Sequence, residues 1–181
     1  SSLIGTLPTS VKTIDITNNG KISLSGNSGA KTTTAMAGDF VTLTNNKDVE
    51  VTGDKAVGMF GAGGSKVLNN TNGTITVGKE GVALYGVNKL GTSTLGDKTI
   101  SLVNKGKITA VSGKESPYGI YAKNNLSLAT RANAKITNEG TIDFTSAGSQ
   151  KFAKATEKTS QGAVTATLKN SDGRTFDAQS I

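Results

Sequence analysis

The side chains of this sequence that could do acid–base or nucleophilic chemistry are carboxylates, lysines and hydroxyls, because the chain contains no histidine and no cysteine. A Ser-His-Asp triad, a thiol nucleophile, an imidazole or thiolate metal site and a disulfide are therefore excluded. Carboxylates alone could cleave polysaccharides, but that chemistry needs two or three acids close together. The 13 acids are instead scattered over different segments. We expect no enzyme activity, no cofactor and no metal.

Lysine supplies nearly all of the positive charge, since arginine occurs only as Arg131 and Arg174. The 20 basic residues exceed the acids and leave a net charge of +7. They are spread along the chain without interleaved aromatic residues that could stack on bases, so we expect no binding to nucleic acid. The favoured roles for these lysines are solubility and protection of strand edges, with a weak attraction to anionic cell surfaces or glycans left open.

Aromatic residues and insertions supply the candidates for partner binding. Phe60, Tyr85 and Tyr121 occupy equivalent places in a recurring glycine-bracketed strand. They could stack on sugars from outside, but we favour packing of the rings in the core or at a corner. The insertions at 111–118 and 145–162 fall at the same place in successive repeats, so we expect them to project side by side. Their proposed partner-contacting residues are Lys114, Glu115, Tyr118, Lys151, Lys154 and Lys158.

A recurring asparagine motif indicates the elements that must position these residues. In each of six copies an aliphatic residue stands two positions before an asparagine, and a glycine follows five of them within two or three residues. Aliphatic residues then return at alternating positions, which is strand periodicity. The asparagines recur every 25 to 34 residues and form the predicted ladder Asn18, Asn45, Asn70, Asn104, Asn138 and Asn170.

A repeat of this length with strand periodicity predicts a solenoid. Asn-x-Gly turns the chain sharply between two strands, and the third strand of each repeat is the glycine-bracketed segment seen at 57–61, 82–86 and 119–122. Weaker versions lie at 35–38 and 162–164. The predicted fold is all-β, a parallel β-helix with about three short strands per rung and five to six rungs. Equivalent residues should stack in columns, such as Ile22, Val49, Ile75, Ile108 and Ile142.

The predicted solenoid is a single domain over residues 1–181. A low aromatic content of 4% suits a narrow aliphatic core in which each rung contacts only its neighbours. No apolar run approaches the length of a membrane span, so we expect no membrane insertion by this chain. The pattern runs to both ends of the sequence, which is typical of a fragment of something longer, and we expect that fragment to be a monomer.

The repeat units resemble the passenger regions of large Gram-negative type V autotransporters, and their Lys-, Asn- and Thr-rich style is most similar to the fusobacterial outer-membrane autotransporter adhesins. The matching units are 104–108, 138–142 and 119–122. The resemblance covers nearly the whole chain and thins over 1–10 and 145–160. It implies a right-handed β-helix displayed on the cell surface, or secreted, that adheres to host cells or other bacteria through a receptor or glycan. It carries over no catalytic residue.

Three functions remain open from the sequence. We favour an adhesive passenger fragment over a purely structural stalk, and both over a polysaccharide-active β-helix enzyme. Clustering of acids on one face would separate the enzyme from the other two. Ordered and decorated loops would separate the adhesin from the stalk.

Overall fold

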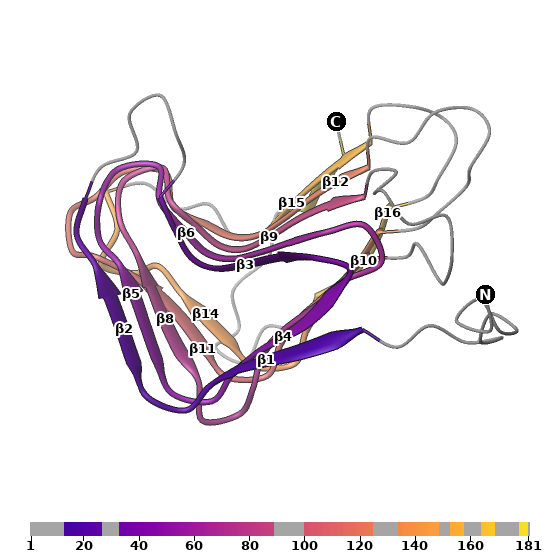
Figure 1. Ribbon diagram of the computed structural model, residues 1–181. Coiled ribbons are helices and arrows are strands. Elements are labelled where there is room, and N and C mark those ends of the chain that lie inside the picture. The colour runs from indigo at the N-terminus through magenta and orange to yellow at the C-terminus, as the bar shows by residue number, and fades with distance from the viewer. Residues whose placement is uncertain are drawn as a thin grey trace, which may run out of the picture.

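A computed structural model of the chain describes residues 13–26, 33–88, 100–124 and 134–148, together with the backbone of three later strands at 153–157, 164–168 and 178–180. The described residues form strands and connecting turns without a helix. They fall into three parallel sheets that form the sides of a solenoid (Figure 1). The predicted all-β parallel β-helix is confirmed.

From β1 to β16, successive strands of the chain pass from one sheet to the next and each third strand returns to the same sheet, whereas β17 follows β16 directly into sheet C. Sheet A contains β1 (Ile14–Asn18), β4 (Val41–Asn45), β7 (Lys66–Asn69), β10 (Ile100–Asn104), β13 (Ala134–Asn138) and β16 (Val164–Leu168). Sheet B contains β2 (Lys21–Leu24), β5 (Asp48–Val51), β8 (Thr74–Val77), β11 (Lys107–Ala110) and β14 (Thr141–Asp143). Sheet C contains β3 (Thr34–Asp39), β6 (Val57–Ala62), β9 (Val82–Asn88), β12 (Tyr118–Asn124), β15 (Ala153–Glu157) and β17 (Ala178–Ser180).

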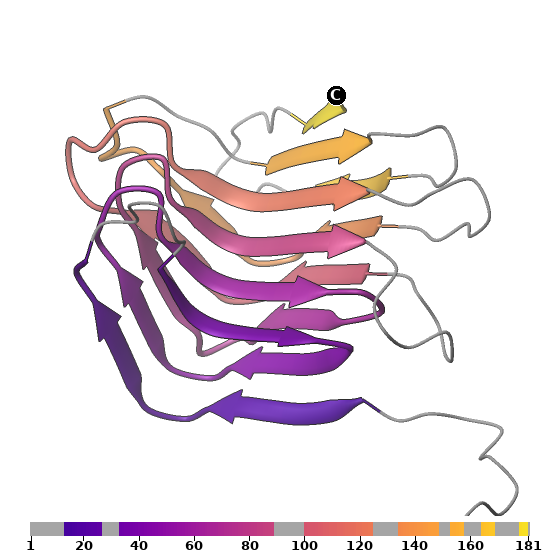
Figure 2. The same ribbon diagram turned by 45° about the horizontal axis from the view of Figure 1, so that its top comes forward.

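One circuit of the chain through the three sheets makes one rung, and the sheets hold six, five and six strands. Figure 2 shows the rungs stacked in chain order, with β1 at one end and the C-terminal strands at the other. Viewed from the β1 end, the chain runs clockwise as it recedes, so the solenoid is right-handed (Figures 1 and 2). The strands of sheet C bend, and their outer face is concave (Figure 1).

The core is a set of aliphatic columns that run along the solenoid axis. The predicted column is confirmed by the sheet B register, in which Ile22 pairs with Val49, Val49 with Ile75, Ile75 with Ile108, and Ile108 with Ile142. Alternation places these side chains inside, and all but Ile22 are buried. Each rung therefore buries its apolar face against the rung before and the rung after it.

The strands of sheet C begin after a turn that the sequence did not reveal. Lys55, Glu80 and Ser116 each stand two residues before a strand of this sheet, and each adopts a positive φ, at 57°, 53° and 52°. This left-handed conformation costs a non-glycine residue about 1–2 kcal/mol. The same strained turn is thus repeated in three successive rungs and directs the chain from sheet B into sheet C.

One predicted strand of sheet C lies elsewhere. The 162–164 segment was expected in this sheet, but β16 begins at Val164 and pairs with β13 in sheet A. The strand that pairs with β12 is β15, inside the supposed insertion 145–162. Its alternating positions are the small residues Ala153 and Ala155, which give too weak an apolar pattern to be recognised as a strand.

Candidate functional site: an aromatic ladder beside a groove

Three aromatic rings form a ladder on the outer face of sheet C. The register pairs Phe60 with Tyr85 and Tyr85 with Tyr121, so the rings lie in successive rungs. The ring centroids of Phe60 and Tyr85 are 5.3 Å apart with a 35° tilt, and those of Tyr85 and Tyr121 are 5.0 Å apart and nearly parallel. Tyr118 meets Tyr121 edge-on at 6.0 Å. These separations are typical of attractive aromatic pairs.

The ladder is half-buried and lies outside the core cluster, so the predicted packing of the rings in the core was wrong, whereas packing at a corner stays a prediction. The preceding residues Met59, Leu84 and Ile120 are the ones that point inward, and all three are fully buried. Alternation then turns the next residue outward. There each ring is partly covered by its neighbours in the ladder and stays partly accessible to solvent. The sequence showed that the rings are equivalent but could not fix the register, because either residue of each pair could fill a core.

A groove with a volume of about 460 Å³ lies against this ladder. It crosses the outer face of β3, β6 and β9, and five of its seven lining residues are apolar or aromatic. The polar ones are the Thr34 hydroxyl and the Lys55 ammonium. The lining residues are Thr34, Lys55, Val57, Phe60, Val82, Tyr85 and Val87. Apolar walls with a few polar groups are the usual composition of a small-molecule site.

The charge at the edge of the groove comes from the repeated turn before sheet C. Lys55 and Glu80 occupy equivalent positions in two successive turns, and their side chains form an ion pair at 3.8 Å. Both side chains are exposed, so solvent screens the pair and its contribution to stability is small. Lys55 is therefore held near the groove by a weak ion pair that another anion could replace.

The pKa of the Tyr85 phenol depends on its position in the middle of the ladder. Burial raises its pKa above the ordinary value of 10.0, and the neighbouring Tyr121 raises it further because two phenolates would repel each other. Tyr85 is consequently an uncharged hydroxyl at neutral pH that can both donate and accept a hydrogen bond.

A column of asparagines closes the corner between sheets A and B. The side-chain Nδ2 of Asn18 donates to Oδ1 of Asn45 at 2.8 Å, and the same donation continues from Asn45 to Asn69, from Asn69 to Asn104 and from Asn104 to Asn138, at 3.0, 2.9 and 2.7 Å. All but Asn18 are buried. Each amide bonds the next rung in the same direction, and the column satisfies buried polar groups along the whole described corner.

The residue of this column in the third rung is Asn69, so the prediction of Asn70 was wrong. Asn69 pairs with Asn45 and Asn104 in the sheet A register. Val67 and Leu68 are both aliphatic, and Val67 is the one that points inward, which places Asn69 rather than Asn70 on the inner face. Asn170 lies outside the described residues; the position opposite Asn138 in β16 is Leu168.

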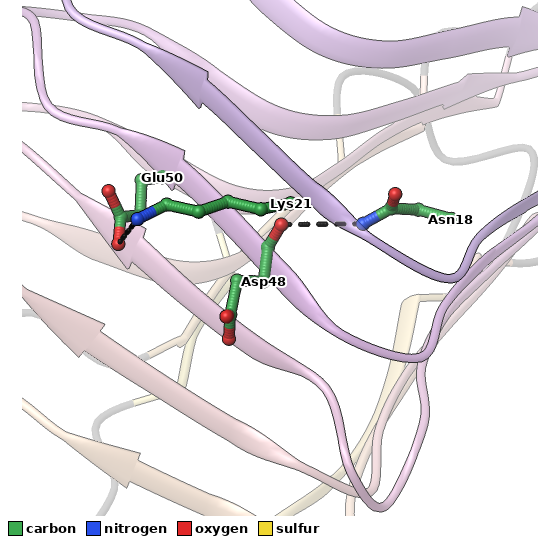
Figure 3. A network of polar contacts seen from close by, with 4 residues as sticks. All are labelled: Asn18, Lys21, Asp48 and Glu50. Atoms are coloured by element: carbon green, nitrogen blue, oxygen red, sulfur yellow. Dashed lines mark hydrogen bonds and ion pairs between the residues drawn. The ribbon is translucent and has the colours of Figure 1, made fainter.

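Asn70 belongs to a second ladder outside the first. Its Nδ2 donates to Oδ1 of Asn46 at 3.0 Å, and Nδ2 of Asn46 donates to Oδ1 of Asn19 at 2.9 Å. The first rungs carry further surface contacts at this corner (Figure 3). There Asn18 Nδ2 donates to the backbone oxygen of Asp48 at 3.3 Å, and Lys21 pairs with Glu50 at 3.3 Å.

The proposed partner residues of the insertions that the structure describes lie partly in a turn and partly in strands of sheet C. Lys114 and Glu115 are exposed in the turn before β12, whereas Tyr118 is the first residue of β12 and contacts the ladder through Tyr121. Lys154 stands opposite Tyr121 in the register of β15, and Lys151 and Lys158 lie outside the described residues. The start of the second insertion does contact the first, since Gly148 N donates to Lys114 O at 2.9 Å.

Within the described part of the chain, acidic side chains gather nowhere in a group of three that could hold a metal ion. That same part contains no helix that is long and apolar enough to cross a membrane. Comparison with known proteins adds no relative, because no family model, curated protein or solved structure matches this chain.

Proposed function

We propose that this chain is a surface-displayed segment of an autotransporter passenger that acts in adhesion to host cells or other bacteria. The observation that carries the proposal is the aromatic groove on the outer, concave face of sheet C. Large rings outside a narrow core do not serve to fill it, and aromatic side chains that remain partly accessible to solvent are typical of recognition surfaces. The resemblance of the repeats to passenger regions supports display outside the cell.

A stalk that only spaces a distant binding tip is the second candidate. The asparagine column favours it, since a continuous chain of amide hydrogen bonds through the described rungs, buried from Asn45 to Asn138, makes a stiff rod. The two candidates differ in what the isolated segment does. An adhesive segment binds cells by itself, whereas a stalk does not.

Adhesion of beads coated with the 181-residue chain tests the proposal. Coated beads are expected to bind host epithelial cells or partner bacteria above the level of beads coated with an unrelated protein of equal net charge, which controls for attraction of a +7 chain to anionic surfaces. Binding no greater than that of the charge-matched beads would favour the stalk and reject an adhesive role.

A further inference from the structure

The groove on sheet C has a size that selects the kind of ligand it can hold. Its volume of about 460 Å³ falls in the range of about 300–1,000 Å³ that small-molecule sites occupy. A folded partner needs about 800 Å² of surface on each side for a stable interface. The groove therefore fits one or two units of an extended or chain-like ligand better than the surface of another domain.

The charge of the groove selects the sign of the ligand. Its lining includes one cation, Lys55, and no acid, and the chain as a whole carries +7. An aromatic ladder alone could bind a quaternary ammonium group, but Lys55 would repel it. An anionic group is favoured instead, because it could replace Glu80 as the partner of Lys55 in a pair that is exposed and weak.

The open shape of the groove separates two kinds of anion. A ligand that lies on the outer face of a sheet stays partly in water, and a fatty acyl chain in that position would leave much of its apolar surface wet. A sugar ring has apolar C–H faces and a polar edge, so it can lie against rings and valines while its remaining hydroxyls stay hydrated. The ladder offers such a surface at Phe60, whose register partner on β3 is the small residue Ala37.

From these observations we propose that the groove binds an acidic sugar unit of a glycan. The sugar's C–H face contacts Phe60, Tyr85 and the valines of the floor, and its carboxylate or sulfate pairs with Lys55 Nζ. The Thr34 and Tyr85 hydroxyls bond its hydroxyl groups. As the ligand of the adhesive segment, this assignment rests on the proposed function, but binding of the sugar itself can be measured without any cell.

The test is a titration of the 181-residue chain, followed by calorimetry, with four soluble oligosaccharides. Three end in N-acetylneuraminic acid, in glucuronic acid or in 6-sulfated galactose, and neutral lactose is the fourth. The three acidic probes distinguish a carboxylate from a sulfate source. Dodecanoate is titrated in parallel as the acyl anion. We expect saturable binding of at least one acidic sugar, at least tenfold tighter than lactose and tighter than dodecanoate.

Matched variants locate the binding. Lys55→Gln is expected to weaken acidic-sugar binding about tenfold or more, the usual effect of losing one charge-assisted hydrogen bond. Lys66→Gln is the control, because Lys66 is an exposed lysine of β7 in sheet A, away from the groove. Tyr85→Leu should weaken binding similarly, and Tyr85→Phe less, since it keeps the ring. Circular dichroism checks that each variant is folded, and Lys55→Gln changes only an exposed side chain.

The outcomes separate this inference from the proposed function. Equal affinity of Lys55→Gln and Lys66→Gln, tighter binding of dodecanoate, or no binding of any acidic probe would overturn the sugar site. If the coated beads adhere and Lys55→Gln beads adhere equally well, adhesion stands and the groove is not its site. If the chain binds an acidic sugar through Lys55 but coated beads do not adhere, the sugar site stands and the adhesive function fails.

Discussion

Asn104 shows how much a single amide does in this solenoid. Its Nδ2 lies within hydrogen-bond distance of Gly106 O, Asn138 Oδ1 and Thr141 O, at 3.3, 2.7 and 3.2 Å, while its Oδ1 accepts from Asn69. One side chain thereby joins its own turn to the rungs on both sides. Serine and threonine hydroxyls supply only one donor, whereas the asparagine amide supplies two donors and an acceptor on a short side chain, which suits it to this corner.

Replacing Asn104 with alanine should lower the free energy of unfolding by about 1–3 kcal/mol, because buried backbone and amide groups lose their partners. Thermal melting followed by circular dichroism would show a loss of roughly 2–4 °C for each kcal/mol. The matched control is Asn72→Ala, an exposed asparagine of the neighbouring turn. Equal melting temperatures for the two variants would refute the role of the column.

Tyr85 gives the molecule a dependence of stability on alkaline pH. Its pKa is raised in the folded state, so below pH 10 the phenol is protonated in both states and contributes no pH dependence. As the pH rises past 10, the unfolded chain loses this proton first, and the equilibrium moves toward unfolding. Between about pH 8 and pH 11, the melting temperature of Tyr85→Phe should fall less steeply with rising pH than that of the parent chain. Identical slopes would contradict this effect.

At the residue scale, the sequence could predict which residue type forms the column better than which positions belong to it. The column needed asparagine, and four of its five members, Asn18, Asn45, Asn104 and Asn138, stand where the motif placed them. The prediction for the third rung was wrong because Asn69 and Asn70 are adjacent and each has an aliphatic residue, Val67 or Leu68, two positions before it. A shift of one residue exchanges the two faces of a strand, and only the neighbouring rungs decide which face is inside.

The corner glycines determine how closely two rungs approach. A Cβ built on Gly106 would overlap the backbone oxygens of Gly73 and Asn70 in the rung below, whereas one built on Gly20 meets nothing within 4 Å. Both glycines follow the asparagine of the motif by two residues. The backbone of the rung below therefore leaves no room for a side chain at position 106, although Lys47 fills the equivalent position of the second rung.

Gly106→Ala and Gly20→Ala form a matched pair that tests this requirement. We expect Gly106→Ala to cost at least about 2 kcal/mol, since the backbone of two rungs must separate, and Gly20→Ala to stay within about 0.5 kcal/mol. Urea unfolding of both variants measures the difference. Similar losses at the two positions would mean that the glycines act through turn conformation and not through contact between rungs.

At the element scale, strands with aliphatic alternation could be predicted and strands without it could not. The sheet B column was evident from five repeats of the same pattern. β15 was missed because its alternating residues are alanines, and the groove was missed because it is formed by strands of three rungs. Residues that are 25 or more apart in sequence, such as Lys55 and Tyr85, become neighbours only through the register.

At the scale of the whole molecule, the described rungs form a stack in which each rung depends on the next, and the exposed large hydrophobic side chains of the described residues lie in β1, the first described strand. Ile14 and Ile16 of β1 are 70% and 40% exposed, whereas their partners Val41 and Leu43 are buried. Solenoid stability is close to a sum of rung and interface terms, so a rung with one neighbour opens more readily than a rung with two.

Hydrogen exchange should reveal this gradient. Amides of β1 and β2 are expected to exchange before those of β5, β7 and β8, and mass spectrometry of peptic peptides can compare these segments directly. The Asn104→Ala variant should raise exchange most in the rungs on either side of residue 104. Uniform exchange across all the strands would instead indicate a single cooperative unit.

The clustering of the aromatic rings also makes the protein its own optical reporter. The chain has three tyrosines and no tryptophan, and Tyr85, Tyr118 and Tyr121 all lie in one set of contacting rings. Its near-ultraviolet absorbance and emission therefore come almost entirely from one patch of sheet C. Because two of these chromophores are stacked nearly parallel, their excited states couple, and any change at the patch alters the spectrum without an added label.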